Sequence, residues 1–106
     1  MTDTQIAWVS GLFEGEGCIH IRKKQRGLIL SLCSTDIDIV QRLQELVGGK
    51  FALKTRNTVP EHWKPIYDWK LHANEQTKAL LLKMLPFFGE RRAYTALNAL
   101  DHLDGI

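Results

Sequence analysis

The chain has 106 residues, of which 44% are hydrophobic and 25% are charged, as in one ordinary globular domain. This composition excludes a disordered tail and a fibrous repeat. It also excludes a bilayer-spanning segment, because no run approaches about 20 consecutive apolar residues. The start, Met1-Thr2-Asp3-Thr4, lacks the basic region and apolar run of a secretory signal, so we expect an intracellular protein with no membrane partner.

The net charge of +2 conceals an uneven distribution. Residues 18–34 and 50–72, which read as two strand hairpins, carry nine Lys or Arg residues and two acids, a balance of +7. The other segments carry five basic and ten acidic residues, a balance of −5. A small net charge with one polarised surface predicts an anionic partner.

The two cysteines, Cys18 and Cys33, are too few for a disulfide scaffold and lack the C-x-x-C spacing of a structural zinc site. We therefore expect two free thiols, as in a reducing compartment.

Taken in chain order, the first apolar residues recur at helical spacing and predict a helix from Thr4 to Gly17. Two alternating runs, 18–24 and 28–34, predict a hairpin that turns at 25–27. Ser34-Thr35-Asp36 then caps a second helix, which Gly48-Gly49 ends.

The second half of the chain predicts strands at 50–56 and 65–72, separated by a polar loop at 57–64. Asn74 is expected to cap a helix that runs through Leu85 and is closed by Pro86. Gly89 precedes a last helix, whose apolar positions are Ala93, Leu97, Leu100 and Leu103. This order, without a linker, predicts one α+β domain over residues 1–106 with antiparallel pairing.

Alternate residues of a strand point to opposite faces, so the apolar set identifies the face that packs against the helices. A turn at Gln25-Arg26 places Ile19 opposite Leu32, Ile21 opposite Leu30, and Cys18 opposite Cys33. In the later strands the same rule assigns the inner face to Phe51, Leu53, Thr55, Tyr67, Trp69 and Leu71.

The outer face of this predicted sheet is nearly one-signed. Its basic residues, set against the single acid Asp68, are Arg22, Lys24, Lys50, Lys54, Arg56 and Lys70. A seven-residue strand is about 23 Å long, which matches about seven base pairs of a duplex. The simpler alternative is a solvated sheet face, since open antiparallel sheets do face water. The predominance of one sign favours contact with phosphates.

The end of the first predicted helix reads V-S-G-L-F-E-G-E-G over residues 9–17. Gly11 and Gly15 each cost a helix about 1 kcal/mol relative to Ala, so the close approach of another backbone is expected to offset that cost. The same helix of a second subunit, packed along Ser10, Gly11 and Gly15, would provide it. Glu16 falls at the helix C-terminus, where the dipole disfavours an anion and where a divalent cation would favour one.

This nonapeptide resembles the signature of the LAGLIDADG homing endonuclease family, and the resemblance extends over nearly the whole chain. It includes the Ser-Thr-Asp helix start, the Gly-Gly before the second hairpin, and Pro-Phe-Phe-Gly-x-Arg-Arg before the last helix. The resemblance implies an α+β fold of αββαββα type, with a four-stranded antiparallel saddle in the DNA major groove and helices on its other face. Because only one signature is present, it also implies a homodimer on a pseudo-palindromic double-stranded site, with the signature helices at the interface.

The resemblance further implies roles for single residues. Glu16 would be the metal-binding catalytic carboxylate, and Gly15 would supply a backbone carbonyl to the same Mg²⁺ or Mn²⁺ site. Lys70 is the nearest match to a basic catalytic residue near the end of the fourth strand, with His72 as the alternative. Residues expected to contact DNA are His20, Arg22, Lys24, Arg26, Lys50, Lys54, Arg56, Lys70 and His72. Residues expected at the dimer interface are Ser10, Gly11, Glu14 and Gly15.

Several side chains also have simpler interpretations. Glu14 lies about 200° around the helix from Glu16, so the two cannot form one bidentate site, and Glu14 is a structural or interface carboxylate. His20 is either a DNA contact or an ordinary surface residue. Trp69 is expected in the core, whereas Trp63 in the loop is undecided. Arg92, like Arg91, would contact either phosphate or an acidic helix.

Two functions from different classes follow. The first is a homodimeric, metal-dependent endonuclease that cuts both strands of a specific site, favoured by Glu16. The alternative is a non-cleaving DNA-binding protein of the same fold, such as a repressor or an intron splicing cofactor. It is favoured by Cys33 and Ser34, which stand where the family commonly has a glutamine. The expected setting is the cytoplasm of a bacterial or phage-infected cell, or an organelle.

Overall fold

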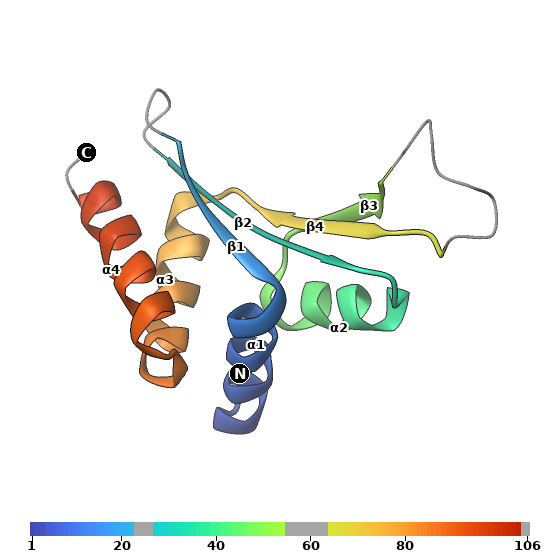
Figure 1. Cartoon of the computed structure of the whole chain (residues 1–106), viewed down its shortest axis with the longest axis horizontal. Coiled ribbons are helices and arrows are strands. Elements are labelled where there is room, and N and C mark those ends of the chain that lie inside the picture. The colour runs from blue at the N-terminus through green and yellow to red at the C-terminus, as the bar shows by residue number, and fades with distance from the viewer. Residues whose placement is uncertain (23–26, 55–63, 105–106) are drawn as a thin grey trace.

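The computed structural model describes residues 1–22, 27–54 and 64–104. Its elements are α1 (Asp3–Glu16), β1 (Gly17–Arg22), β2 (Gly27–Ser34), α2 (Ile37–Val47), β3 (Lys50–Leu53), β4 (Tyr67–Leu71), α3 (Asn74–Met84), the 3₁₀ helix η1 (Leu85–Phe87) and α4 (Glu90–Asp104). The strands form an antiparallel sheet in the order β1-β2-β4-β3. All four α-helices lie on one side of this sheet (Figure 1), so the α+β prediction is confirmed. None of the helices in the described ranges has the length and apolar character needed to span a bilayer.

Local signals set the two ends of α1. Thr2 is the N-cap and forms a capping box with Gln5, in which each side chain accepts the backbone N–H of the other residue, at 3.1 and 2.9 Å. At the other end, α1 stops at Glu16 and β1 begins at Gly17. A Cβ on Gly17 would lie 2.8 Å from the Cα of Phe13, so only glycine fits there. The chain thus passes from helix to strand within one residue.

The turn between α2 and β3 depends on two glycines. Gly48 and Gly49 have φ angles of 82° and 86°, in the left-handed region that glycine adopts without strain. The indole Nε1 of Trp69 donates to the Gly48 carbonyl at 2.9 Å, and Nε2 of Gln44 donates to the Gly49 carbonyl at 3.1 Å. These bonds tie the turn to β4 and α2.

The register of the β1–β2 hairpin differs from the prediction by two residues. Ile19 lies opposite Leu30 rather than Leu32, and Cys18 lies opposite Ser31 rather than Cys33. Because side chains alternate with period two, this shift leaves every side chain on its predicted face. Residues 23–26, whose turn sets the register, lie outside the described residues.

Two predictions about the helices are wrong. Asn74 is the first residue of α3 rather than its cap, and its Oδ1 accepts the N–H of Leu28 on β2 at 3.4 Å. Leu97 is 50% exposed, whereas Ala96 and Ala99 are buried. Leu100 is buried and Leu103 packs against the core, as predicted. The predicted start of α4 after Gly89 is confirmed.

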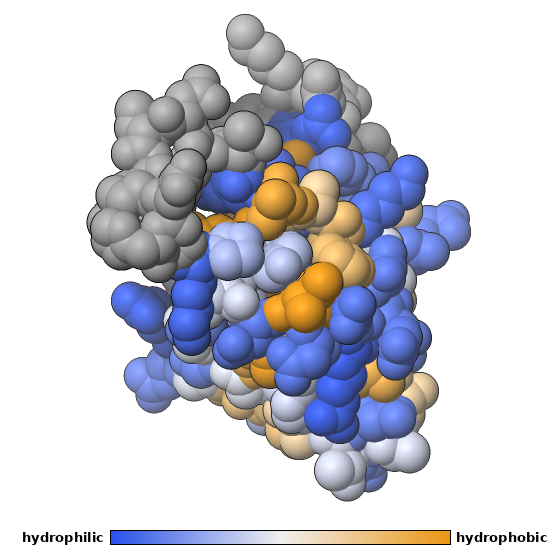
Figure 2. All heavy atoms as spheres, turned by 90° about the vertical axis from the view of Figure 1, so that its right-hand side faces the viewer, coloured by the Kyte–Doolittle hydropathy of each residue, from blue (hydrophilic) through white to orange (hydrophobic). Residues whose placement is uncertain are grey.

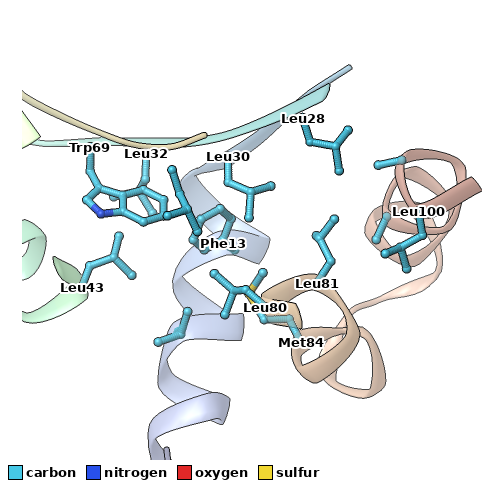
Figure 3. Close-up of a cluster of buried hydrophobic side chains, with 14 of the residues drawn as sticks. Phe13, Leu28, Leu30, Leu32, Leu43, Trp69, Leu80, Leu81, Met84 and Leu100 are labelled. Atoms are coloured by element: carbon cyan, nitrogen blue, oxygen red, sulfur yellow. The ribbon is translucent and has the colours of Figure 1, made fainter. Parts of the chain in front are cut away.

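The core lies between the sheet and the helices. Leu28, Leu30 and Leu32 of β2 point toward the helices (Figure 3), and all three are buried. Phe13 of α1 packs edge-on against Trp69 of β4, with ring centroids 5.7 Å apart, which confirms Trp69 as a core residue. Leu53 is 58% exposed despite its inward assignment, since it ends the edge strand β3. Thr55 and Trp63 lie outside the described residues.

Candidate nucleic-acid interface and metal site

The sheet face opposite the helices carries basic side chains. Those that the structure describes as exposed are His20, Lys50, Lys54, Lys70 and His72, and Arg22 is half-buried. The predicted contacts Lys24, Arg26 and Arg56 lie outside the described residues. Lys50, Lys54, Lys70 and His72 together line part of a hollow of about 650 Å³. Figure 2 shows mostly hydrophilic residues around a small apolar area on the side of the molecule where β3 ends and β4 begins.

Lys70 lies at the centre of this face. It is directly opposite Lys50 on β3 and Ser31 on β2. Like charges placed directly opposite each other in a sheet are destabilising. The Nζ of Lys70 is 3.6 Å from Oδ2 of Asp68, but the lysine side chain is 50% exposed, and ion pairs in such settings are weak. The face therefore has positive charge in excess of what its own acid neutralises.

Cys33 lies beside the same acid. Its Sγ donates to Oδ1 of Asp68 at 3.4 Å. Burial raises the pKa of the Cys33 thiol above its usual 9.0, and the hydrogen bond to Asp68 raises it further. The side chain is thus a neutral hydrogen-bond donor at neutral pH. Both cysteines are free, as the sequence predicts.

Glu16 is exposed at the end of α1. It lines a second hollow, of about 450 Å³, together with Cys33, Ser34 and Asp36. Sequence reasoning did not select Asp36, which precedes α2 and reads as a cap, yet its side chain makes no capping bond. The structure therefore brings a second carboxylate to the hollow of Glu16. Lys70, by contrast, lines the first hollow and not the second.

Oxygen donors at this hollow are of the type that Mg²⁺ and Mn²⁺ take. Within the ranges that the structure describes, no three His, Cys, Asp or Glu side chains gather in a group able to hold a metal ion. The oxygen donors that line it are the carboxylates of Glu16 and Asp36 and the hydroxyls of Ser34 and Thr35, all of them hard. The Cys33 thiol in the same hollow donates to Asp68 instead. The chemistry of the oxygen donors fits a hard divalent cation.

Glu14 is directed away from Glu16, toward α4. Its Oε2 accepts the backbone N–H of Gly89 at 3.3 Å. Arg92 lies beside it and donates to the carbonyls of Gly17 and Glu14, at 3.0 and 3.2 Å. Neither sequence interpretation of Arg92, phosphate contact or ion pair with an acidic helix, describes this arrangement. No local sequence signal could reveal it, because the partners are 75 and 78 residues apart.

Gly11 and Gly15 are exposed on α1. A Cβ built on either glycine would meet nothing within 4 Å. Ala7, one turn earlier, is exposed as well, so the three small residues form an open stripe along the helix. Ser10 is not part of this stripe, because it is fully buried and its Oγ donates to the Ile6 carbonyl at 2.7 Å.

A family model described as a LAGLIDADG-like domain matches residues 3–85, from α1 to the start of η1. The chain belongs to the LAGLIDADG homing endonuclease family. The homing endonucleases of this family hydrolyse phosphodiester bonds of DNA. In this LAGLIDADG chain, α1 is the signature helix and Glu16 its last acidic residue.

Solved structures of LAGLIDADG proteins share the fold. The homing endonuclease I-CvuI, in complex with its DNA target in the presence of calcium, superposes with a TM-score of 0.70 at 18% identity, covering 96% of this chain and 67% of that chain. Meganuclease I-SmaMI bound to uncleaveable DNA gives a TM-score of 0.51 at 18% identity, over 77% of this chain and 30% of that chain. At this identity the likeness establishes the fold alone. No curated protein matches the LAGLIDADG chain.

Proposed function

We propose that this LAGLIDADG protein is a homodimeric, metal-dependent endonuclease that cuts one phosphodiester bond in each strand of a pseudo-palindromic DNA site. Residues 1–106 would act as one domain of this enzyme. The observation that carries the proposal is the position of Glu16. It is an exposed carboxylate at the junction between a helix with an open glycine stripe and a sheet with a basic face.

DNA binding is supported by the charge of that face. Lysines with excess positive charge attract phosphates, and each phosphate they neutralise releases counterions from the duplex. The cross-strand repulsion between Lys50 and Lys70 would be relieved by a bound polyanion. Two neighbours of the same fold, I-CvuI and I-SmaMI, were solved with DNA.

A homodimer is supported by the stripe of Ala7, Gly11 and Gly15. Glycines inside a helix reduce its stability by about 1 kcal/mol each, and close packing of a second backbone offsets that loss. Two α1 helices crossing along the stripe would bring their C-terminal ends together at a twofold axis. Both Glu16 carboxylates would then lie at the centre of the assembly, where neighbouring phosphates of the two strands can be reached. Glu14 points toward α4 and would lie beside this interface rather than in it.

Metal dependence is supported by the donor chemistry at Glu16. The Glu16 carboxylate and the Gly15 carbonyl would hold Mg²⁺ or Mn²⁺. When bound, such an ion supplies activation of a water nucleophile and neutralises charge on the phosphate. The basic sheet face orients the duplex. Lys70, which lines the other hollow and whose ion pair with Asp68 is weak, would stabilise the negative charge that develops on the phosphate if the bound duplex reaches both hollows.

The test compares wild type with Glu16→Gln on a supercoiled plasmid that carries the insertion-site sequence of the gene. We expect wild type to linearise the plasmid with Mg²⁺ and not with EDTA. The variant should bind with unchanged affinity and cleave roughly a hundredfold more slowly or worse, as for the loss of a metal ligand. Glu75→Gln, at an exposed acid in the first turn of α3, is the charge-matched control. Equal cleavage by Glu16→Gln would contradict the assignment of Glu16.

A second candidate function is DNA binding without cleavage, as in a repressor or a splicing cofactor. It is favoured by Cys33 and Ser34 in the hollow of Glu16, where family members commonly have a glutamine. Specific binding by wild type, with no cleavage at any Mg²⁺ or Mn²⁺ concentration, would support this candidate against the endonuclease.

A further inference from the structure

The C-terminal end of α1 concentrates negative charge. Its last turn contains Glu14 and Glu16 and no basic residue. The helix dipole adds partial negative charge at the same end, and the terminal carbonyl groups have no partners within the helix. A cation from another part of the chain would therefore stabilise this helix end.

Arg92 of α4 supplies that cation. Its two guanidinium Nη atoms donate to the carbonyls of Gly17 and Glu14, at 3.0 and 3.2 Å. In return, the Glu14 carboxylate accepts the N–H of Gly89, directly before the N-terminus of α4, where the helix dipole favours an anion. We call these three hydrogen bonds between the end of α1 and the start of α4 the clasp.

We propose that Arg92 is a positioning residue for Glu16, and this inference rests on the endonuclease function proposed above. The clasp fixes the backbone on both sides of Glu16, two residues before it and one residue after it. It engages the carbonyls of Glu14 and Gly17 and not that of Gly15, the carbonyl proposed as a metal ligand. It therefore holds the helix end in shape without consuming the ligands that the helix end presents.

The planar guanidinium explains why arginine serves here. Its fork places two N–H donors in a fixed geometry that spans two carbonyls, whereas the lysine ammonium is a single point of attachment. Arg92 is half-buried and belongs to the Pro-Phe-Phe-Gly-x-Arg-Arg segment at the start of α4.

The experiment uses the full chain with Arg92→Gln, Arg92→Lys, and Lys83→Gln as a charge-matched control on exposed α3 surface. Amide hydrogen exchange of the peptide spanning residues 14–19 reports the helix end in the free protein. Mn²⁺ titration of the protein–DNA complex, followed by electron paramagnetic resonance, reports the site. We would also measure, for each variant, the Mg²⁺ concentration for half-maximal cleavage and the affinity for DNA.

For Arg92→Gln we expect amide exchange at residues 14–19 to rise at least tenfold. Mn²⁺ affinity should fall about tenfold, in the range seen when groups that orient metal ligands are removed. DNA affinity should stay within about threefold of wild type, because both Nη atoms of Arg92 donate to backbone carbonyls of its own chain. Arg92→Lys should lie between wild type and Arg92→Gln, and Lys83→Gln should match wild type. If Arg92→Gln does not fold, Arg92→Lys against wild type carries the same comparison.

Unchanged exchange at residues 14–19 would overturn the inference, since the clasp would not fix the helix end. Faster exchange with wild-type Mn²⁺ affinity and wild-type Mg²⁺ dependence would also overturn it, by making Arg92 merely structural. Failure of the proposed function has a different signature. In that case wild type would not cut DNA. Any Mn²⁺ binding by wild type would be the same in Glu16→Gln.

Discussion

Lys70 faces Lys50 directly across the β3–β4 pair, on the sheet face opposite the helices. Such a pair reduces the stability of the free protein, because like charges placed directly opposite each other on neighbouring strands repel. It is explained if the face meets an anion in use. The pair should therefore lower the unfolding free energy of the free chain and raise its affinity for DNA. The two effects can be measured separately.

Replacing Lys50 with Met removes the repulsion and retains most of the side-chain stem. We expect the free energy of unfolding of the free protein to rise by about 0.5 kcal/mol. DNA affinity should fall, and the slope of log Kd against log salt concentration should decrease by about 1, as one phosphate contact is lost. Urea unfolding and fluorescence anisotropy at several salt concentrations give both numbers. Lys83→Met is the control, and an unchanged salt slope for Lys50→Met would remove Lys50 from the contact surface.

The glycine stripe on α1 predicts opposite effects of added side chains on the monomer and on the proposed dimer. Gly11→Ala should raise the helix stability of the monomer by up to about 1 kcal/mol, because a Cβ there meets nothing within 4 Å. Gly11→Leu should dissociate the dimer in sedimentation equilibrium while the circular dichroism spectrum stays that of a folded chain. Asn98→Leu adds the same bulk at an exposed position of α4 and should leave the dimer intact. A Gly11→Leu variant that sediments as a dimer would exclude this face as the interface.

At Gly17, unlike Gly11, we expect substitution by alanine to lower the free energy of unfolding. Gly17→Ala forces a methyl group against Phe13, including its Cα at 2.8 Å, at the point where α1 passes into β1. Overpacking of this kind costs about 1–3 kcal/mol of unfolding free energy. Urea unfolding of Gly17→Ala beside Gly11→Ala makes the comparison, since the two variants add one methyl group to the same segment. Equal stability of both variants would contradict the described junction.

The pKa of Cys33 predicts a pH dependence of stability. The folded-state pKa of Cys33 is raised above the usual 9.0, mainly by burial, so the folded state binds the thiol proton more tightly than the unfolded state does. The stability that this proton provides is complete below about pH 9 and is lost as the pH rises through the folded-state pKa. We expect the unfolding free energy of wild type to decline more steeply above about pH 9 than that of Cys33→Ala. Urea unfolding across this range tests the expectation. Cys18→Ala, at an exposed thiol, should keep the wild-type slope.

Features that depend on local sequence could be predicted, and features that depend on distant parts of the chain could not. Strand alternation gave the correct faces of β1 and β2, because burial of one face has period two. It missed the register by two residues, because the geometry of the turn fixes the register and alternation does not. Parity alone predicts that Leu53 lies in the core, whereas its place at the end of an edge strand leaves it exposed.

The candidate site divides in the same way. Glu16 could be selected because its motif and its place at a helix end are both visible in the sequence. Arg92 could not, because its partners on α1 are brought to it only by the packing of α4. Asp36 could not be selected as a site residue, because its position before α2 is equally typical of a helix cap. Asn74 shows the same ambiguity, since a residue typical of caps bonds to β2 instead.

The direct passage from α1 into β1 through Gly17 has a consequence for target length. Because no loop separates them, the orientation of α1 determines the orientation of β1 and of the sheet to which it belongs. In a dimer that joins through α1, the crossing angle of the two helices therefore fixes how far apart the two sheets sit along the duplex. That angle, rather than any side chain that touches a base, would decide how many base pairs separate the two half-sites of an acceptable target.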